Sequence, residues 1–283
     1  MTPRYDTVSF LSDFGSEDEF VGVVKAVLRG LAPHAAVVDL THGIPAFDVR
    51  AGGLALARAA QYLPPGVVLA VVDPGVGTDR RAVAIEAAGG EVAFVGPDNG
   101  LLASAVAMLG GAERAVALTN TELQLAAPGA TFAARDVFAP AAAHLANGGR
   151  FEELGPEVDV FSLLPGVLPV AERKGDEVET EVLWVDRFGN AQLNVGPDDL
   201  EGMGDRLAIR FAGTVRAAVR ATTYGAVGSG VGLVVDAYGL LSVCLDRQSA
   251  AAELGLDVGD RVVVTTADDR AVTVPVTMRT GPR

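Results

Sequence analysis

Asp73 and Arg80 are the two residues whose types and spacing best suit chemistry. Asp73 directly follows a short aliphatic run, residues 67–72, and a turn that contains two glycines separates it from Arg80. The turn brings the arginine within reach of the aspartate, and an arginine so placed keeps a carboxylate ionised. Such a pair could orient a water molecule or could simply brace the loop, and the residue types leave both roles open.

Three further acids share the setting of Asp73, because each follows an apolar, strand-like run. They are Asp13, Asp39 and Asp98. The carboxyl ends of parallel strands meet at one edge of a sheet, where α/β proteins bind ligands, so we expect the four acids to converge. Gathered carboxylates suit a divalent cation or the vicinal hydroxyls of a ribose. The metal is the weaker interpretation and we expect none, because no two histidines are at ligand spacing; His34, His42 and His144 are expected to be surface or packing residues.

Other motifs of catalysis are missing or have a simpler explanation. The glycines at 75 and 77 lack the Gly-Lys-Ser/Thr ending of a phosphate-binding loop, and no Gly-x-Ser-x-Gly nucleophile elbow is present. The one cysteine, Cys244, lies in an apolar run with no histidine after it, so we expect a small core residue. Arg135 and Asp136 lie in an apolar setting and are expected to be hydrogen-bonded structure.

Alternating strand and helix patterns position these residues in the first half of the chain. Strands are predicted at residues 7–11, 36–40 and 67–72, the last two of them buried, and a hairpin at 83–86 and 92–95. Helices are predicted at residues 20–31, 49–62, 101–109 and 141–146. Ser16 and Glu19 suit a capping box for the first helix. This alternation predicts an α/β domain with a mainly parallel sheet and right-handed crossovers.

The pattern changes beyond residue 164. Prolines, glycines and charges predict a linker over residues 165–176, between an α/β domain at 1–164 and a second domain at 177–283. The second domain consists of short strand-like runs with few helices, which predicts an all-β, barrel-like fold. These runs are residues 179–185, 193–195, 207–211, 215–221, 231–235, 240–245, 261–265 and 272–278.

Composition excludes some classes of partner. The chain has 283 residues, 49% of them hydrophobic, and a net charge of −14. We expect no binding to nucleic acid, because phosphate contacts need a clustered basic surface and no run of lysine or arginine occurs. No charged-then-apolar leader and no uninterrupted apolar span are present, so we expect no membrane association and a cytoplasmic protein.

Six motifs, in order along nearly the whole chain, resemble those of the S-adenosylmethionine (SAM) hydroxide adenosyltransferases, relatives of fluorinase and chlorinase. They are Ser12-Asp13-Phe14-Gly15, Val38-Asp39-Leu40-Thr41-His42, Val71-Val72-Asp73-Pro74-Gly75-Val76-Gly77-Thr78, Gly96-Pro97-Asp98-Asn99-Gly100, Arg135-Asp136-Val137-Phe138-Ala139-Pro140 and Asp186-Arg187-Phe188-Gly189-Asn190. The resemblance implies an α/β domain followed by a β-barrel. It also implies a homotrimer whose substrate lies between one subunit's first domain and its neighbour's second.

The reaction implied by the resemblance is displacement at the ribose C5′ of SAM, with methionine leaving as a neutral thioether. Hydrolytic members deliver water or hydroxide, yield adenosine and L-methionine, and need no cofactor. The resemblance implies that Asp73 and Arg80 position the attacking water. It assigns substrate contacts to Asp13 at the ribose, Asp186 at the methionine amino group, Asn190 at adenine, Phe132, Ala134 and Phe188 in the pocket wall, and Arg247 at the methionine carboxylate.

The chain departs from the family pattern at one catalytic position. Hydrolytic members read Thr-Phe-His-Gly-Arg-Asp where this chain has Ala133 and Ala134 after Phe132. A positioned acid or base commonly contributes about 10²–10⁴-fold, so we expect a slow hydrolase, or a SAM- or adenosine-binding protein that has lost turnover. A 5′-halogenase is the weaker alternative, because Asp73 at about 4 Å would repel a halide by roughly 4 kcal/mol at an intermediate dielectric.

Overall fold

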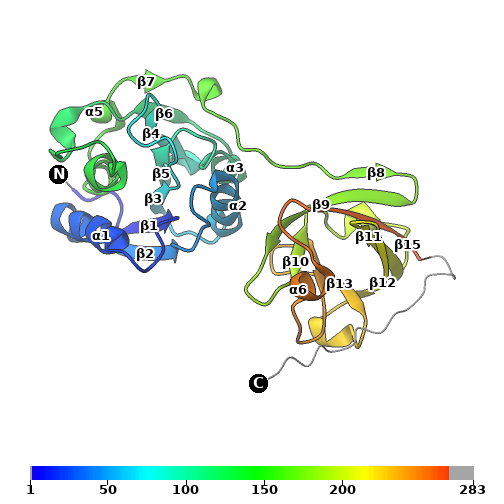
Figure 1. Ribbon diagram of the computed structural model, residues 1–283. Coiled ribbons are helices and arrows are strands. Elements are labelled where there is room, and N and C mark those ends of the chain that lie inside the picture. Colours follow the sequence, from blue (N-terminus) through cyan, green and yellow to red (C-terminus); the bar gives the residue numbers. More distant parts are fainter. Residues whose placement is uncertain (1, 268–283) are drawn as a thin grey trace. The chain divides into compact units, whose positions relative to one another are not determined.

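The computed structural model describes residues 2–267, so the strand predicted at 272–278 lies outside the described residues. The chain divides into two compact units, Met1–Val167 and Leu168–Arg283 (Figure 1). The division falls within the range 165–176 that was expected to be a linker. The last residues of that range form a short strand, β8 (Glu172–Lys174).

The first unit is built on a seven-stranded sheet in the order β2-β1-β3-β5-β4-β6-β7. Its strands are β1 (Thr7–Ser12), β2 (Ala36–Thr41), β3 (Gly66–Val71), β4 (Ala82–Ala87), β5 (Val92–Pro97), β6 (Arg114–Ala117) and β7 (Glu157–Val158). Strands β2, β1, β3 and β5 are parallel, whereas β4 is antiparallel to β5 and to β6, and β7 to β6. Five of the seven strands therefore run in one direction, which confirms the mainly parallel sheet.

Helices cover both faces of this sheet (Figure 1). They are α1 (Phe20–Leu31), α2 (Val49–Ala60), α3 (Ala103–Met108), α4 (Ala139–Ala146) and α5 (Phe151–Leu154). In β3, Val67, Leu69 and Val71 pack in the same core as residues of α1 and α4. The alternate residues of β3 pack with residues of α2 and α3. The central strand is thus apolar on both faces, as expected for a buried parallel strand.

Two predictions about local structure were wrong. The strand at 36–40 exists as β2, but it is largely exposed because it forms the edge of the sheet. Ser16 and Glu19 do not form a capping box, because α1 begins at Phe20, with Glu19 at the N-cap and no side-chain cap. The hairpin of β4 and β5 is confirmed, and its turn uses the positive φ angles of Gly89 (66°) and Gly90 (83°).

The second unit contains a closed seven-stranded barrel. Its hydrogen-bonded order is β10-β14-β13-β12-β11-β15-β9, and pairing of β9 with β10 closes the ring, while β8 adds to β9. The strands of the ring are β9 (Glu177–Val185), β10 (Ala191–Leu193), β11 (Arg206–Phe211), β12 (Thr214–Ala221), β13 (Val231–Val235), β14 (Leu241–Cys244) and β15 (Arg261–Thr266), and a short helix α6 (Ala250–Leu254) precedes β15. The barrel-like fold is confirmed, and closure leaves the ring without open edges.

Cys244 lies on β14 inside the second unit. Its side chain is fully buried and packs with Val227 and Val234. Burial raises the pKa of the thiol to about 12, so it stays protonated at neutral pH. The prediction of a core cysteine is confirmed.

Candidate active site

Asp73 and Arg80 form a bidentate ion pair in the loop between β3 and β4. Arg80 Nε donates to Asp73 Oδ1 at 2.9 Å, and Nη2 donates to Oδ2 at 2.5 Å. The loop is fixed by its own turns, since the Thr78 hydroxyl donates to the Gly75 carbonyl at 2.7 Å and Gly77 adopts a φ of 78°. The side chains are only 6% (Asp73) and 12% (Arg80) exposed, so the pair is shielded from bulk water.

Asp73 is under opposing electrostatic influences. Burial raises the pKa of its carboxyl group, the attraction and hydrogen bonds of Arg80 and the Gly75 N–H oppose the rise, and the carboxylate of Asp13 adds to it. The net effect is a pKa above the ordinary value. Perturbed acids of this kind, held in a cavity by a specific partner, are typical of functional sites.

A cavity of about 380 Å³ lies beside this pair. Asp13, which follows β1, lines it together with Asp73 and is fixed by the backbone N–H of Phe47, which donates to Oδ2 at 2.9 Å. Three phenylalanine rings form one wall. Ring centroids are 5.9 Å apart for Phe14 and Phe132, and 5.0 Å apart for Phe20 and Phe132.

Ala133 and Ala134 complete the wall beyond Phe132. They lie where the chain enters a π-helical turn, η3 (Ala134–Phe138), that leads into α4. Such turns occur frequently at functional sites. Arg135 donates to both carboxylate oxygens of Asp136, at 2.6 and 2.9 Å, and stacks over Phe132. This confirms Arg135 and Asp136 as hydrogen-bonded structure.

The four acids do not all converge. Asp13 and Asp73 share the cavity, but Asp39 lies within β2, where it pairs with Lys25 at 2.8 Å and His42 at 3.2 Å. Asp98 binds Arg81 at 2.6 Å and lines a different cavity. The convergence prediction was wrong for Asp39, because Asp39 lies within its strand and does not follow the strand's end. Asp98 follows β5 at the predicted edge, but it pairs with Arg81 and does not line the Asp73 cavity.

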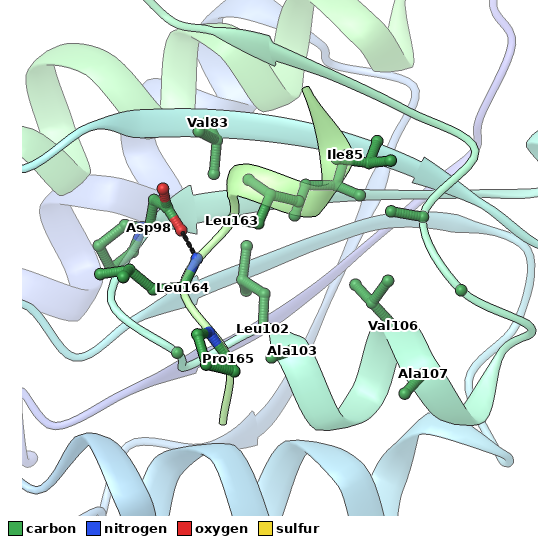
Figure 2. A pocket seen from close by; sticks show the side chains of 15 residues that line it. Val83, Ile85, Asp98, Leu102, Ala103, Val106, Ala107, Leu163, Leu164 and Pro165 are labelled. Carbon is green, nitrogen blue, oxygen red and sulfur yellow. Dashed lines mark hydrogen bonds between the residues drawn. The ribbon is translucent and has the colours of Figure 1, made fainter. Parts of the chain in front are cut away.

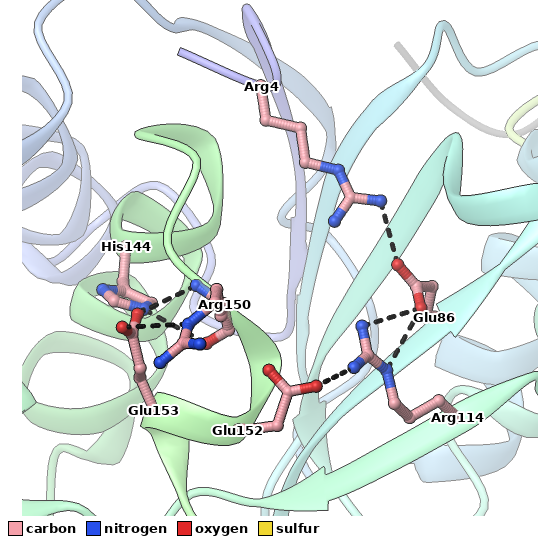
Figure 3. Close-up of polar contacts among 7 residues, drawn as sticks. All are labelled: Arg4, Glu86, Arg114, His144, Arg150, Glu152 and Glu153. Carbon is pink, nitrogen blue, oxygen red and sulfur yellow. Dashed lines mark hydrogen bonds and ion pairs between the residues drawn. The ribbon is translucent and has the colours of Figure 1, made fainter. Parts of the chain in front are cut away.

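The histidines take packing and surface roles. His42 Nδ1 lies 2.8 Å from Ser12 Oγ and its ring packs on Phe10. With Asp39 this makes a serine, histidine and aspartate chain, but Ser12 is fully buried and cannot serve as a nucleophile. His144, on α4, lies 3.1 Å from Glu153, in the group of polar contacts drawn in Figure 3.

The remaining predicted site residues belong to the second unit. Asp186, after β9, organises a tight turn: Oδ1 accepts from the backbone N–H groups of Phe188 and Asn190, and Oδ2 accepts from the Asn190 side chain at 2.7 Å. Phe188 is 78% exposed. Arg247, two residues before the cap of α6, has a 93% exposed side chain. The structure thus brings Asp186, Phe188 and Asn190 into one turn and places Arg247 on another.

Sequence reasoning missed Phe14 and Phe20 as wall residues. Phe14 stands next to Asp13 in a motif that had been singled out, so its position was a usable signal. Phe20 was assigned only to the apolar pattern of α1. No periodicity shows that the first residue of a helix faces a cavity rather than the core.

Both units match sequence models of one family. The model of the SAM hydroxide adenosyltransferase N-terminal domain covers residues 8–155, and that of the C-terminal domain covers residues 180–263. The chain belongs to the SAM hydroxide adenosyltransferase family. Relatives named (R)-S-adenosyl-L-methionine hydrolase support this: that of Salinispora tropica is 45% identical over 91% of this chain and 97% of its own length, and that of Thermus thermophilus 49% identical over 89% and 96%.

This chain is also similar to a more distant relative and to a solved structure. A fluorinase of Actinoplanes sp. is 28% identical over 72% of this chain and 77% of its own length. The crystal structure of an uncharacterised conserved protein from Thermotoga maritima superposes with a TM-score of 0.84 at 32% identity, covering 91% of this chain and 99% of that one. Within residues 2–267, no helix is long and apolar enough to cross a membrane.

Proposed function

We propose that this protein hydrolyses SAM to adenosine and L-methionine, by attack of water or hydroxide at the ribose C5′. Membership of the SAM hydroxide adenosyltransferase family and the names of its relatives support this reaction class. The observation that carries the proposal is the shielded Asp73 and Arg80 pair at the wall of a cavity lined by Asp13 and four phenylalanines.

Asp73 positions the nucleophile in this proposal. A carboxylate has about four lone-pair sites, and the two hydrogen bonds from Arg80 leave acceptor capacity for a water. Arg80 keeps the carboxylate ionised and fixes its orientation. Asp13 binds the ribose hydroxyls, and the phenylalanine rings beside Asp13 and Asp73 suit a sulfonium cation.

The departing group needs no help from the protein. A sulfonium leaves as a neutral thioether, so no proton has to be supplied and no metal or other cofactor is required. Catalysis then depends on holding water in line with the C5′–S bond, which is a matter of proximity and orientation.

Loss of turnover is the second candidate function, and Ala133 is the observation that favours it. Its methyl group lines the cavity where a histidine would supply an acid or base. A protein that has lost turnover would keep the cavity and bind SAM or adenosine in it, but would not hydrolyse SAM.

One assay separates the candidates. The protein is incubated with SAM, with and without chloride, and the products are separated by chromatography. Adenosine and methionine in both samples support the hydrolase, and 5′-chloro-5′-deoxyadenosine in the chloride sample would indicate a halogenase. Tight binding of SAM without adenosine at high protein concentration would instead establish the binding protein.

The second unit is proposed to complete the site in a homotrimer in the cytoplasm. In this arrangement residues 1–164 carry the nucleophile site, residues 165–176 act as a linker, and residues 177–283 bind adenine and methionine through Asn190, Asp186 and Arg247, with Phe188 in the wall. Light scattering coupled to gel filtration tests the assembly, and a monomeric mass with full activity would contradict it.

A further inference from the structure

The motif Gly96-Pro97-Asp98-Asn99-Gly100 is not used by the site described above, and the structure gives its residues other partners. Residues 160–165, here called the strap, lie near the end of the first unit and run beside this motif. Val160 and Leu163 of the strap pack on the core of α2, α3 and β4. A cavity of about 230 Å³ lies between the strap and the sheet. Its walls are mostly apolar, and Asp98 lines one end of it (Figure 2).

Arg81 and Asp98 hold the strap. Arg81 donates from Nη1 to the Ser162 hydroxyl at 3.0 Å and from Nη2 to the Ser162 carbonyl at 2.5 Å. Its Nε donates to Asp98 Oδ2 at 2.8 Å, and Asp98 Oδ1 accepts from the backbone N–H of Leu164 at 2.8 Å (Figure 2). The Asp98 side chain is only 5% exposed, so its charge is shielded and paired.

The same residues contact the Asp73 loop. Arg80 Nη1 donates to the Arg81 carbonyl at 2.9 Å, and the Asp98 N–H donates to that carbonyl at 2.9 Å as well. The Asn99 side chain donates to the carbonyl of Val72, the residue before Asp73, at 2.9 Å. The guanidinium of Arg80 is therefore held between the Asp73 carboxylate and a peptide group that Asp98 fixes.

We propose that Arg81 and Asp98 are positioning residues, which hold the Arg80 guanidinium in its two-pronged bond to Asp73. The two neighbouring arginines have different partners: Arg80 binds the Asp73 carboxylate at the cavity, and Arg81 connects the loop to Asp98 and the strap. The inference rests on the proposed function for its kinetic test, because it assigns a role in the same site.

The test compares Arg81→Gln with the wild type and with Arg114→Gln. Arg114 is a matched control, since its guanidinium also pairs with carboxylates of the first unit, those of Glu86 and Glu152 (Figure 3), neither of which lines the Asp73 cavity. For SAM hydrolysis we expect Arg81→Gln to lower kcat about tenfold or more, because small misplacements of catalytic groups are costly, with KM within about twofold.

The pH profile separates positioning from general destabilisation. Arg80 lowers the pKa of Asp73, so a loosened Arg80 raises it, and the acid limb of kcat moves to higher pH in Arg81→Gln. The control keeps the wild-type profile. The proposal would be overturned if kcat of Arg81→Gln fell together with its melting temperature while the acid limb of its pH profile stayed at the wild-type position. An unchanged kcat would overturn it as well.

Two further measurements keep the result decisive. If Arg81→Gln does not fold, the double variant Arg81→Gln/Asp98→Asn removes both charges together and leaves no buried carboxylate unpaired, and the same shift is expected of it. If the wild type does not hydrolyse SAM, the proposed function fails. The titration midpoint of Asp73 is then measured by NMR from the ¹³C chemical shift of its carboxyl carbon, and the variant Asp73→Asn assigns that signal. A higher midpoint in Arg81→Gln than in wild type and control supports positioning, and equal midpoints overturn it.

Discussion

Ala133 is the residue that we expect to limit the rate of the proposed reaction. Substituting Ala133→His places an acid or base at the cavity wall, beside Phe132, and we expect the rate of adenosine formation to rise by about 10²-fold or more. Ala133→Asn is the matched control, since it adds similar bulk without a group that titrates near neutral pH. Equal rates in the two variants would show that filling the space matters and proton transfer does not.

In the proposed mechanism, Asp73 is expected to set the pH dependence of SAM hydrolysis. Attack by water needs the ionised carboxylate, so activity rises with pH as Asp73 loses its proton. Burial raises this pKa, and the midpoint of the acid limb is therefore expected above the ordinary aspartate value. Measurement of kcat/KM across the acid range checks this, and a midpoint at or below the ordinary value would contradict the role of Asp73 as the group that must be ionised.

At the scale of elements, the contact between β3 and β5 places the Asp73 loop beside the Asp98 motif. A Cβ added at Gly96 of β5 would lie 2.3 Å from the Ala70 carbonyl oxygen of β3. Gly96→Ala must therefore displace one strand, and we expect a loss of several degrees in melting temperature. Gly30→Ala in α1 meets nothing within 4 Å and should be neutral or stabilise by up to about 1 kcal/mol. Equal melting temperatures for the two variants would contradict the close approach.

Periodicity predicted most elements because apolar spacing reports burial directly, as in α1 and in β13, whose bounds agree at both ends. Periodicity gave wrong predictions where the burial or the partner of a residue depends on neighbours that are distant in sequence. The residues of β2 read as a buried strand, and only the sheet order makes that strand an edge. Asp98 follows a strand as Asp73 does, but its side chain forms an ion pair with Arg81. Spacing along the chain does not reveal that partner.

At the scale of the whole molecule, the proposed function requires the barrel unit to bind substrate. Asp186→Asn keeps a side-chain oxygen that can accept from the N–H groups of Phe188 and Asn190, but it removes the charge proposed for the methionine amino group. We expect KM for SAM to rise about tenfold or more, since a hydrogen bond to a charged group is worth roughly 1.5–3 kcal/mol, with a smaller change in kcat. Asp199→Asn is the control, because Asp199 also organises a turn of this unit by accepting from Gly196 N–H. Identical KM values in both variants would contradict the proposed role of Asp186 in binding SAM.

The central claim is that water, held by Asp73, attacks the ribose C5′ of SAM. Turnover in water enriched in ¹⁸O, followed by mass spectrometry of the products, tests it most directly. We expect adenosine that carries one ¹⁸O at its 5′ oxygen and unlabelled methionine. Formation of both products is expected to be at least about 10²-fold slower in Asp73→Asn. Absence of adenosine, or adenosine without the label, would contradict it.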